Sequence, residues 1–131
     1  MSSYGPRIAA LARRAERERG AFDPARGTPA DASFYLREGV GPAVWLYVEG
    51  RTGGRLARFS AAEIAALERA MNDWLELYAR CHGVELSAGF TLREAAAVLL
   101  ETRNVFDTAQ LLTAVPARGV EPVGGDRCRS Q

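Results

Sequence analysis

The strongest pattern of apolar and polar positions runs from Phe59 to Gly83 and predicts a long amphipathic helix that stops at the glycine. Apolar residues recur there at alternating steps of three and four, which places them on one stripe of a helix with 3.6 residues per turn. Charged residues fall on the opposite side, so we expect one face in a core and the other in water. The stripe consists of Ile64, Leu67, Met71, Trp74, Tyr78 and Cys81, widened by Leu75.

Helix starts are marked by a recurring signature, in which Phe precedes a Ser, Thr or Asp cap and a Glu or Gln follows three positions after the cap. The cap side chain accepts from a backbone N–H of the first turn, and the Glu or Gln side chain reaches back to the cap. The signature occurs at residues 59–63, 90–94 and 106–110. It predicts a second helix at Leu92–Thr102, stopped by a left-handed Asn104. A third is expected at Thr108–Val115, ended by Pro116.

The stretch from residue 33 to residue 59 alternates apolar positions between glycine-rich breaks and predicts a three-stranded antiparallel meander. The expected strands are Ser33–Glu38, Ala43–Glu49 and Arg55–Phe59. The middle strand is apolar on both faces, so it is expected to be central and to need cover on both sides. Which face the long helix covers stays open. We expect part of the sheet, with Trp45 and Tyr47, to form an interface with a second copy or a partner.

The two ends of the chain are expected to add little to the core. Residues 1–32 read as a mobile N-terminal helix with a thin, mostly alanine apolar side, followed by a linker. Residues 116–131 have too few apolar positions to fold and are expected to be disordered. The predicted fold class is therefore α+β, with a single domain at 33–115. In it, the meander is covered by the long helix and by a C-terminal helical hairpin.

Composition limits the classes of partner. The 131 residues are 47% hydrophobic and 25% charged, which is typical of one globular domain. A net charge of +1 predicts no strong general attraction to nucleic acid or to an anionic membrane. Two cysteines make no disulfide framework, and the sequence contains no apolar run near 20 residues. We therefore expect a cytoplasmic protein without a membrane association.

Candidate chemistry is sparse along the chain. His82 follows Cys81, but neighbouring helical residues point about 100° apart, so we expect a packed helix end rather than a nucleophile or metal site. We predict no catalytic residue, no metal and no cofactor. Residues 50–55 place Arg51 and Arg55 among glycines, which makes them a candidate anion cradle. A hairpin turn is the alternative explanation of those glycines.

The densest polar group between two apolar helices consists of Glu101, Arg103, Asn104 and Asp107, and this corner is the candidate ligand or partner site. Capping and ion pairing are the alternative roles for such residues. Residues 91–115 also read as two short helices joined by a tight turn, and their opening resembles the first helix of excisionase-type helix-turn-helix domains. That resemblance implies DNA binding, but no arginine or lysine follows on the second helix to meet phosphate.

The patterns favour a small cytoplasmic, non-enzymatic binding or regulatory protein that acts through protein contacts, as a homodimer or with a heterologous partner. The alternative is a helix-turn-helix DNA-binding regulator that uses residues 91–115. A third possibility is an enzyme acting on a small anionic substrate, which would need a deep pocket lined by Glu101, Arg103 and Asp107.

Overall fold

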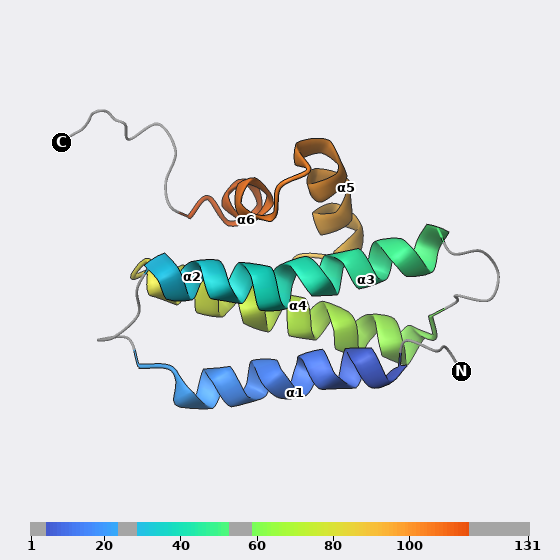
Figure 1. Cartoon of the computed structure of the whole chain (residues 1–131), viewed down its shortest axis with the longest axis horizontal. Helices are drawn as coiled ribbons and strands as arrows, with labels where there is room; N and C mark the ends of the chain where they lie inside the picture. Colours follow the sequence, from blue (N-terminus) through green and yellow to red (C-terminus); the bar gives the residue numbers. More distant parts are fainter. Residues whose placement is uncertain (1–4, 24–28, 53–58, 116–131) are drawn as a thin grey trace.

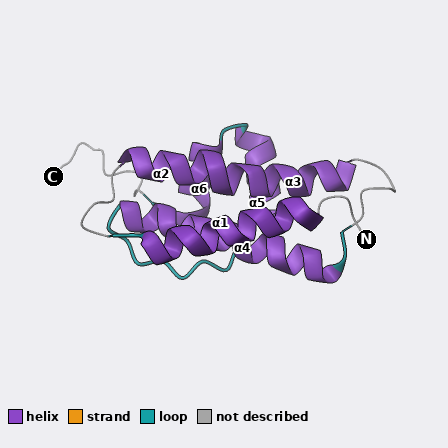
Figure 2. Ribbon diagram, turned by 60° about the horizontal axis from the view of Figure 1, so that its bottom comes forward, coloured by secondary structure: helices purple, strands orange, loops and turns teal. Residues whose placement is uncertain are grey.

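The structure is a computed structural model that describes residues 5–23, 29–52 and 59–115, and every regular element in these ranges is helical (Figure 1, Figure 2). The α2, η2 and α3 segments follow one another without a break and are called the α2–α3 unit below. This unit lies alongside α1 and α4, and the α5–α6 hairpin sits on the side away from α1 (Figure 1). In chain order the elements are α1 Gly5–Ala21, α2 Pro29–Tyr35, the π-helical turn η2 Leu36–Val40, α3 Gly41–Thr52, α4 Ala61–Cys81, α5 Leu92–Thr102 and α6 Val105–Thr113.

The predicted α+β fold with its three-stranded meander is wrong, because no residue in the described ranges lies in a strand. Residues 33–38 and 43–49, expected as the first two strands, both belong to the α2–α3 unit. Residues 55–58 of the third expected strand lie outside the described residues. The protein is therefore an all-helical domain wherever the structure describes it.

The physical reason lies in how the α2–α3 unit is buried. Leu36, Val40, Ala43 and Tyr47 recur at steps of three and four, and all four are buried. A helix that is apolar on several sides is one that is covered on several sides. Here the unit packs against α4 in the bundle and against α5 and α6 on another side. The two-sided apolar run thus indicated a sandwiched helix and not a central strand.

Residues 39–42, the glycine-containing break between the first two expected strands, stay helical because the helix widens into a π turn. The Gly41 N–H donates to the Leu36 carbonyl, five residues back. Pro42 has no N–H, and its ring would clash with the carbonyl four residues earlier, so an ordinary α-helical turn is disfavoured there. Gly39 serves a separate purpose: a Cβ at this position would lie 2.1 Å from Cδ2 of Trp74. The missing side chain lets the unit approach the Trp74 ring directly.

The N-terminal helix is packed rather than mobile, which corrects the second part of the predicted fold. Ile8, Leu11 and Ala15 of α1 are buried against the bundle. The small alanine side therefore permits a close contact with α4 instead of preventing one. Helix α1 runs to Ala21 and α2 begins at Pro29, while residues 24–28 of the expected linker lie outside the described residues. The same holds for the expected disordered tail at 116–131.

Helix α4 is the centre of the core, as its stripe predicts, and its start is confirmed. The Ser60 hydroxyl accepts from the Glu63 N–H over 3.0 Å, and the Glu63 carboxylate accepts from the Ser60 N–H over 2.9 Å. Gly83 follows the helix with a φ of 76°, the left-handed conformation expected of a stop. Thr91 and Glu94 form the same reciprocal cap on α5. The largest fully buried side chains of α4 are Leu67, Met71, Trp74, Leu75 and Leu77.

Candidate functional site at the C-terminal hairpin

Polar side chains of α4 fix the position of the C-terminal hairpin. Asn72 pairs with the backbone of Phe90 in both directions. Its Nδ2 donates to the Phe90 carbonyl over 2.9 Å, and its Oδ1 accepts from the Phe90 N–H over 3.0 Å. One turn earlier, the Glu68 carboxylate accepts from the Leu92 N–H over 2.8 Å. The first turn of α5 therefore starts at a point that α4 dictates.

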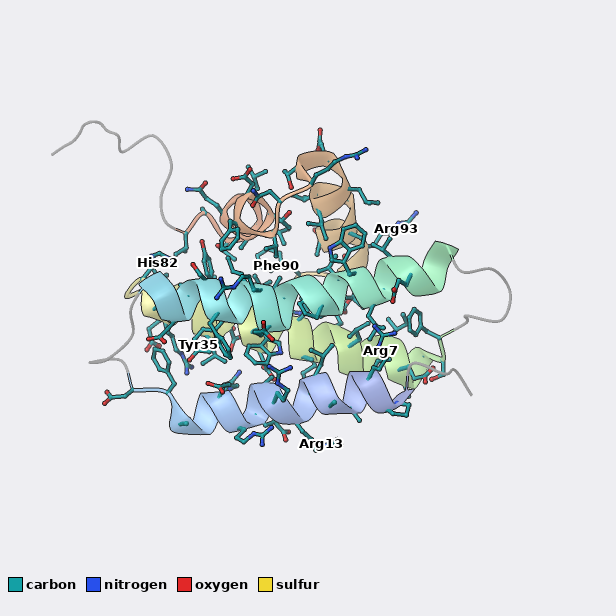
Figure 3. All side chains as sticks on the ribbon, viewed as in Figure 1. Arg7, Arg13, Tyr35, His82, Phe90 and Arg93 are labelled. Carbon is teal, nitrogen blue, oxygen red and sulfur yellow. The ribbon has the colours of Figure 1, made fainter. Side chains whose placement is uncertain are left out.

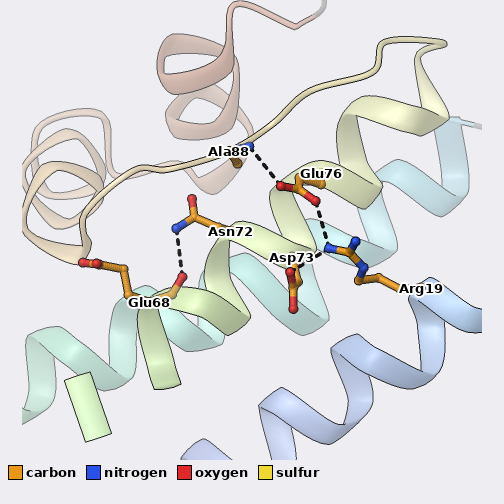
Figure 4. Close-up of polar contacts among 6 residues, drawn as sticks. All are labelled: Arg19, Glu68, Asn72, Asp73, Glu76 and Ala88. Atoms are coloured by element: carbon orange, nitrogen blue, oxygen red, sulfur yellow. Dashed lines mark hydrogen bonds and ion pairs between the residues drawn. The ribbon is translucent and has the colours of Figure 1, made fainter. Parts of the chain in front are cut away.

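Glu76 continues this row and links it to α1 (Figure 4). Its carboxylate accepts from the Ala88 N–H over 3.0 Å and from the Arg19 guanidinium over 2.8 Å. Arg19 also donates to Asp73 over 2.7 Å. Burial raises the pKa of Asp73, and the nearby Arg19 only partly offsets that effect. The polar side of α4, expected to face water, is thus used to hold the helices on either side of it.

The predicted polar corner is largely a helix cap. The Asn104 Oδ1 accepts from the N–H groups of Phe106 and Asp107 over 2.8 and 3.1 Å. The Thr108 hydroxyl in turn donates to the Asn104 carbonyl over 2.9 Å. Helix α6 therefore begins at Val105, three residues before the expected Thr108, and Asn104 is its cap rather than a left-handed stop. The Phe106 and Asp107 N–H groups, which an anion would use at this helix start, are already bound by Asn104.

The other two corner residues do not join a common site. Arg103 is the residue in the left-handed conformation, with a φ of 57°, and it closes α5 through its N–H to the Leu99 carbonyl. Glu101 and Arg103 are both exposed, and neither forms an ion pair with another described residue. The hollow that Asp107 lines, described below, includes neither Glu101 nor Arg103.

The remaining predicted site residues lie on or beyond α3. Tyr47 is buried, and its ring stacks near that of Phe59 with centroids 6.5 Å apart. Trp45 is 49% exposed, because two residues along a helix turn the side chain by about 200° instead of returning it to the same face. Arg51 belongs to the last turn of α3 rather than to a hairpin. Arg55 lies outside the described residues.

A shallow hollow of about 260 Å³ opens where α2, α4 and α6 meet. The Tyr78 and His82 rings lie edge to face on one side of it, with centroids 5.1 Å apart. The Tyr78 hydroxyl donates to the Val115 carbonyl, and burial raises the pKa of this phenol. Figure 3 shows His82 at the end of the bundle where α4 finishes. The lining residues are Ala32, Ser33, Leu36, Tyr78, His82, Phe106, Asp107 and Gln110.

This hollow combines apolar walls with a few hydrogen-bonding groups, which suits contact with another molecule. Of the predicted corner, only Asp107 lines it. Sequence reasoning missed Tyr78 and Phe106 as lining residues, although each is four residues from another lining residue, His82 and Gln110 respectively, and this spacing could have indicated a shared helix face.

The Cys81 thiol is a poor nucleophile. Burial, aided by Asp31, raises the pKa of Cys81 to about 11, so the thiol is protonated near neutral pH.

Three large apolar side chains of the hairpin are exposed. Leu100 of α5 is 52% exposed, and Phe106 and Leu111 of α6 are 41% and 51% exposed. The inner faces of the same two helices are covered, since Leu99 and Ala109 are buried.

The described helices include none with the length and apolar content needed to cross a membrane. Among the described residues, no three side chains of the metal-binding types converge on one point.

The fold and this surface define a class: a small helical-bundle domain with a C-terminal helical hairpin that presents apolar side chains outward. Within that class the chain belongs to the family described as "Domain of unknown function (DUF8055)", whose model matches residues 2–117. No curated protein and no solved structure matches the chain.

Proposed function

We propose that the chain is a small, non-enzymatic binding protein that acts through protein–protein contacts made by the α5–α6 hairpin. The observation that supports this most is the exposure of Leu100, Phe106 and Leu111 on one 22-residue hairpin. Single exposed apolar side chains are common on monomers, whereas three large ones on one short hairpin favour a contact surface. The hollow beside Phe106 adds a recess into which a partner side chain fits.

Two observations weigh against the alternatives. Helix α6 has no basic residue, and its outward side carries Asp107 and Leu111, so it offers phosphate groups no positive charge. An enzyme for an anionic substrate would need an arginine at the hollow, but Arg103 does not line it and Asp107 would repel an anion. DNA binding and catalysis are therefore not the functions we propose.

The same proposal places the protein in the cytoplasm. Cys81 is a free thiol, which suits a reducing compartment. The partner is either a second copy of this chain or a different protein, and the hairpin surface is the proposed contact in both cases.

Photo-crosslinking in the native host tests the proposal. A photoreactive phenylalanine analogue is placed at Leu111, at Phe106 or, as the control, at Ala65, which is exposed on α4. We expect crosslinked products of defined mass from positions 111 and 106 and none from position 65. Mass spectrometry then distinguishes a dimer of the chain from a heterologous complex. Equal yields from all three positions, or none from the hairpin, would contradict the proposal.

A further inference from the structure

The outer face of α5 is a helix surface that no described residue of this chain covers. Arg93, Ala97, Leu100 and Glu101 are all exposed on it. Figure 3 shows Arg93 pointing away from the bundle. The Glu94 carboxylate on this side is already engaged in the cap of α5. Neither Arg93 nor Glu101 forms an ion pair with another described residue, so two opposite charges stand unpaired near the two ends of one helix.

The charges on this face match those of a second copy of the helix that runs in the opposite direction. Ala97 is the middle residue of the 11-residue helix, and Arg93 and Glu101 stand four residues before and after it. In an antiparallel pair with a twofold axis at Ala97, Arg93 of each copy faces Glu101 of the other. The two resulting charge pairs lie about 12 Å apart along the helix axis. With this spacing, both arginines and both glutamates of the pair lie opposite a residue of the other charge.

The apolar residues fit the same arrangement. The methyl group of Ala97 lets two helices approach closely at the axis, in the manner of small residues at helix crossings. Leu100 then lies next to the aliphatic stem of the partner's Arg93, which covers an otherwise exposed apolar side chain. The Glu94 side chains lie on the Glu101 flank of this face, away from Leu100, and stay in contact with their own helix caps. When two copies pair, the charged side chains of this face therefore find opposite charges, and Leu100 is covered.

We infer that α5 is the site of self-association and that its occupant is α5 of a second copy, paired antiparallel through two exchanged Arg93–Glu101 ion pairs. This inference rests on the proposed function, because it names a second copy as a partner of the hairpin. One helix pair buries less than a standard interface of about 1,600 Å², so we expect a weak dimer with a Kd of roughly 10 to 100 µM.

Charge reversal tests the pairing. Sedimentation equilibrium from about 5 to 500 µM, chosen to bracket the expected Kd, compares the unaltered chain with Arg93→Glu, Glu101→Arg and the double variant. Each single reversal turns both symmetry-related pairs repulsive, so we expect a Kd at least about tenfold higher. The double variant restores complementarity and should return the Kd close to the original value. An equimolar mixture of the two single variants should associate as a heterodimer with a Kd close to the original value. In that heterodimer one pair keeps its original charges and the other has both charges reversed, so both pairs are attractive.

Ala97→Trp supplies an independent steric test, because the exposed position tolerates a large side chain in one copy but separates two copies at the axis. Arg69→Glu, an exposed charge reversal on α4, is the matched control and should leave the Kd unchanged. Far-ultraviolet circular dichroism checks that every variant keeps its helical content. A chain that stays monomeric at all concentrations, or a dimer whose Kd ignores the reversals, would overturn the pairing. Crosslinks from Leu111 to a different protein would still support the proposed function in that event.

Discussion

The bundle, which consists of α1, the α2–α3 unit and α4, and the C-terminal hairpin use their apolar side chains in different ways. In the bundle, α4 is covered on several sides, so that Trp74, Leu75 and Leu77 are all fully buried. In the hairpin, neighbouring leucines separate: Leu99 is 2% exposed and Leu100 is 52% exposed. A helix covered on one side alone keeps apolar residues on the other side only at a cost in solubility. The bundle is therefore the stable framework, and the hairpin is the part with surface left for another molecule.

The two regions are also held by different interactions. The bundle relies on shape at its centre, where the Trp74 ring lies against the Gly39 backbone, with the Tyr35 ring centroid 5.8 Å away. The guanidinium carbon of Arg14 lies 6.0 Å from the Trp74 ring, while the indole N–H has no hydrogen-bond partner among the described residues. The hairpin instead depends on hydrogen bonds that Asn72 and Glu68 form with the backbone of Phe90 and Leu92. Changes of shape should thus damage the bundle most, and losses of hydrogen bonds should loosen the hairpin.

Removal of residues 1–21 should give the largest effect. It deletes α1, whose Ile8 and Leu11 are buried, and uncovers the face of α4 that carries Trp74. Burying two such side chains contributes about 3 to 6 kcal/mol, so we expect loss of the cooperative thermal transition followed by circular dichroism. Removal of residues 117–131 keeps every described element and is the control. An unchanged melting temperature without α1 would show that the helix is dispensable to the bundle.

Gly39→Ala should have the next largest effect. The added methyl would lie 2.1 Å from the fully buried Trp74 ring, so the α2–α3 unit must move away, at a cost of about 2 to 4 kcal/mol in the free energy of unfolding. Gly20→Ala is the matched control, because no atom lies within 4 Å of its added methyl. In the α1 helix this control should stabilise the protein by about 0.5 kcal/mol. Urea denaturation of both variants measures the difference, and equal effects would remove close packing as the role of Gly39.

How much the sequence predicts also differs along the chain. The stripe of α4 and the two reciprocal caps at Ser60 and Thr91 were predictable, because each depends on local spacing and on hydrogen bonds within four residues. The third cap was not, since Asn104 and Asp107 both suit a helix start and only Asn104 lies next to the left-handed Arg103 that turns the chain. Local rules give candidates for a cap, and tertiary geometry chooses among them.

The α2–α3 unit exposes the limit of pattern reading more sharply. Its glycines at positions 39 and 50 resemble turn residues, yet a Cβ at Gly50 would lie 2.0 Å from the Phe59 ring, so packing of another element requires the glycine. Such a requirement is set by the element that packs against the glycine: Trp74 of α4 at Gly39, and Phe59, just before α4, at Gly50. The hollow beside His82 likewise joins three elements, and no local spacing could bring Ser33 and Phe106 together. Only the packed arrangement of helices specifies that site.

Asn72→Ala should loosen the hairpin while leaving the bundle folded. It removes the two hydrogen bonds to the Phe90 backbone and leaves a part-buried N–H and carbonyl without that partner, which costs about 1 to 2 kcal/mol. Hydrogen exchange should accelerate at Phe90 and Leu92 and change little at Leu75. Arg69→Ala, an exposed change on the same helix, is the control. Uniform acceleration throughout α4 would show that the hairpin and the bundle open together as one unit.

Leu100→Ala should have the smallest effect on stability, and its neighbour makes the test sharp. Leu100 is 52% exposed, so its truncation in dilute solution should change the free energy of unfolding by less than about 0.5 kcal/mol. Leu99→Ala makes the same chemical change one residue earlier, in a side chain that is 2% exposed, and should cost about 2 to 5 kcal/mol. Urea denaturation at low micromolar concentration measures both without contributions from self-association. Because helix propensity changes equally in the two variants, the difference reports burial alone.

A large loss of stability for Leu100→Ala under these conditions would mean that this leucine belongs to the core of a single copy. The hairpin would then not be the region with surface left for another molecule.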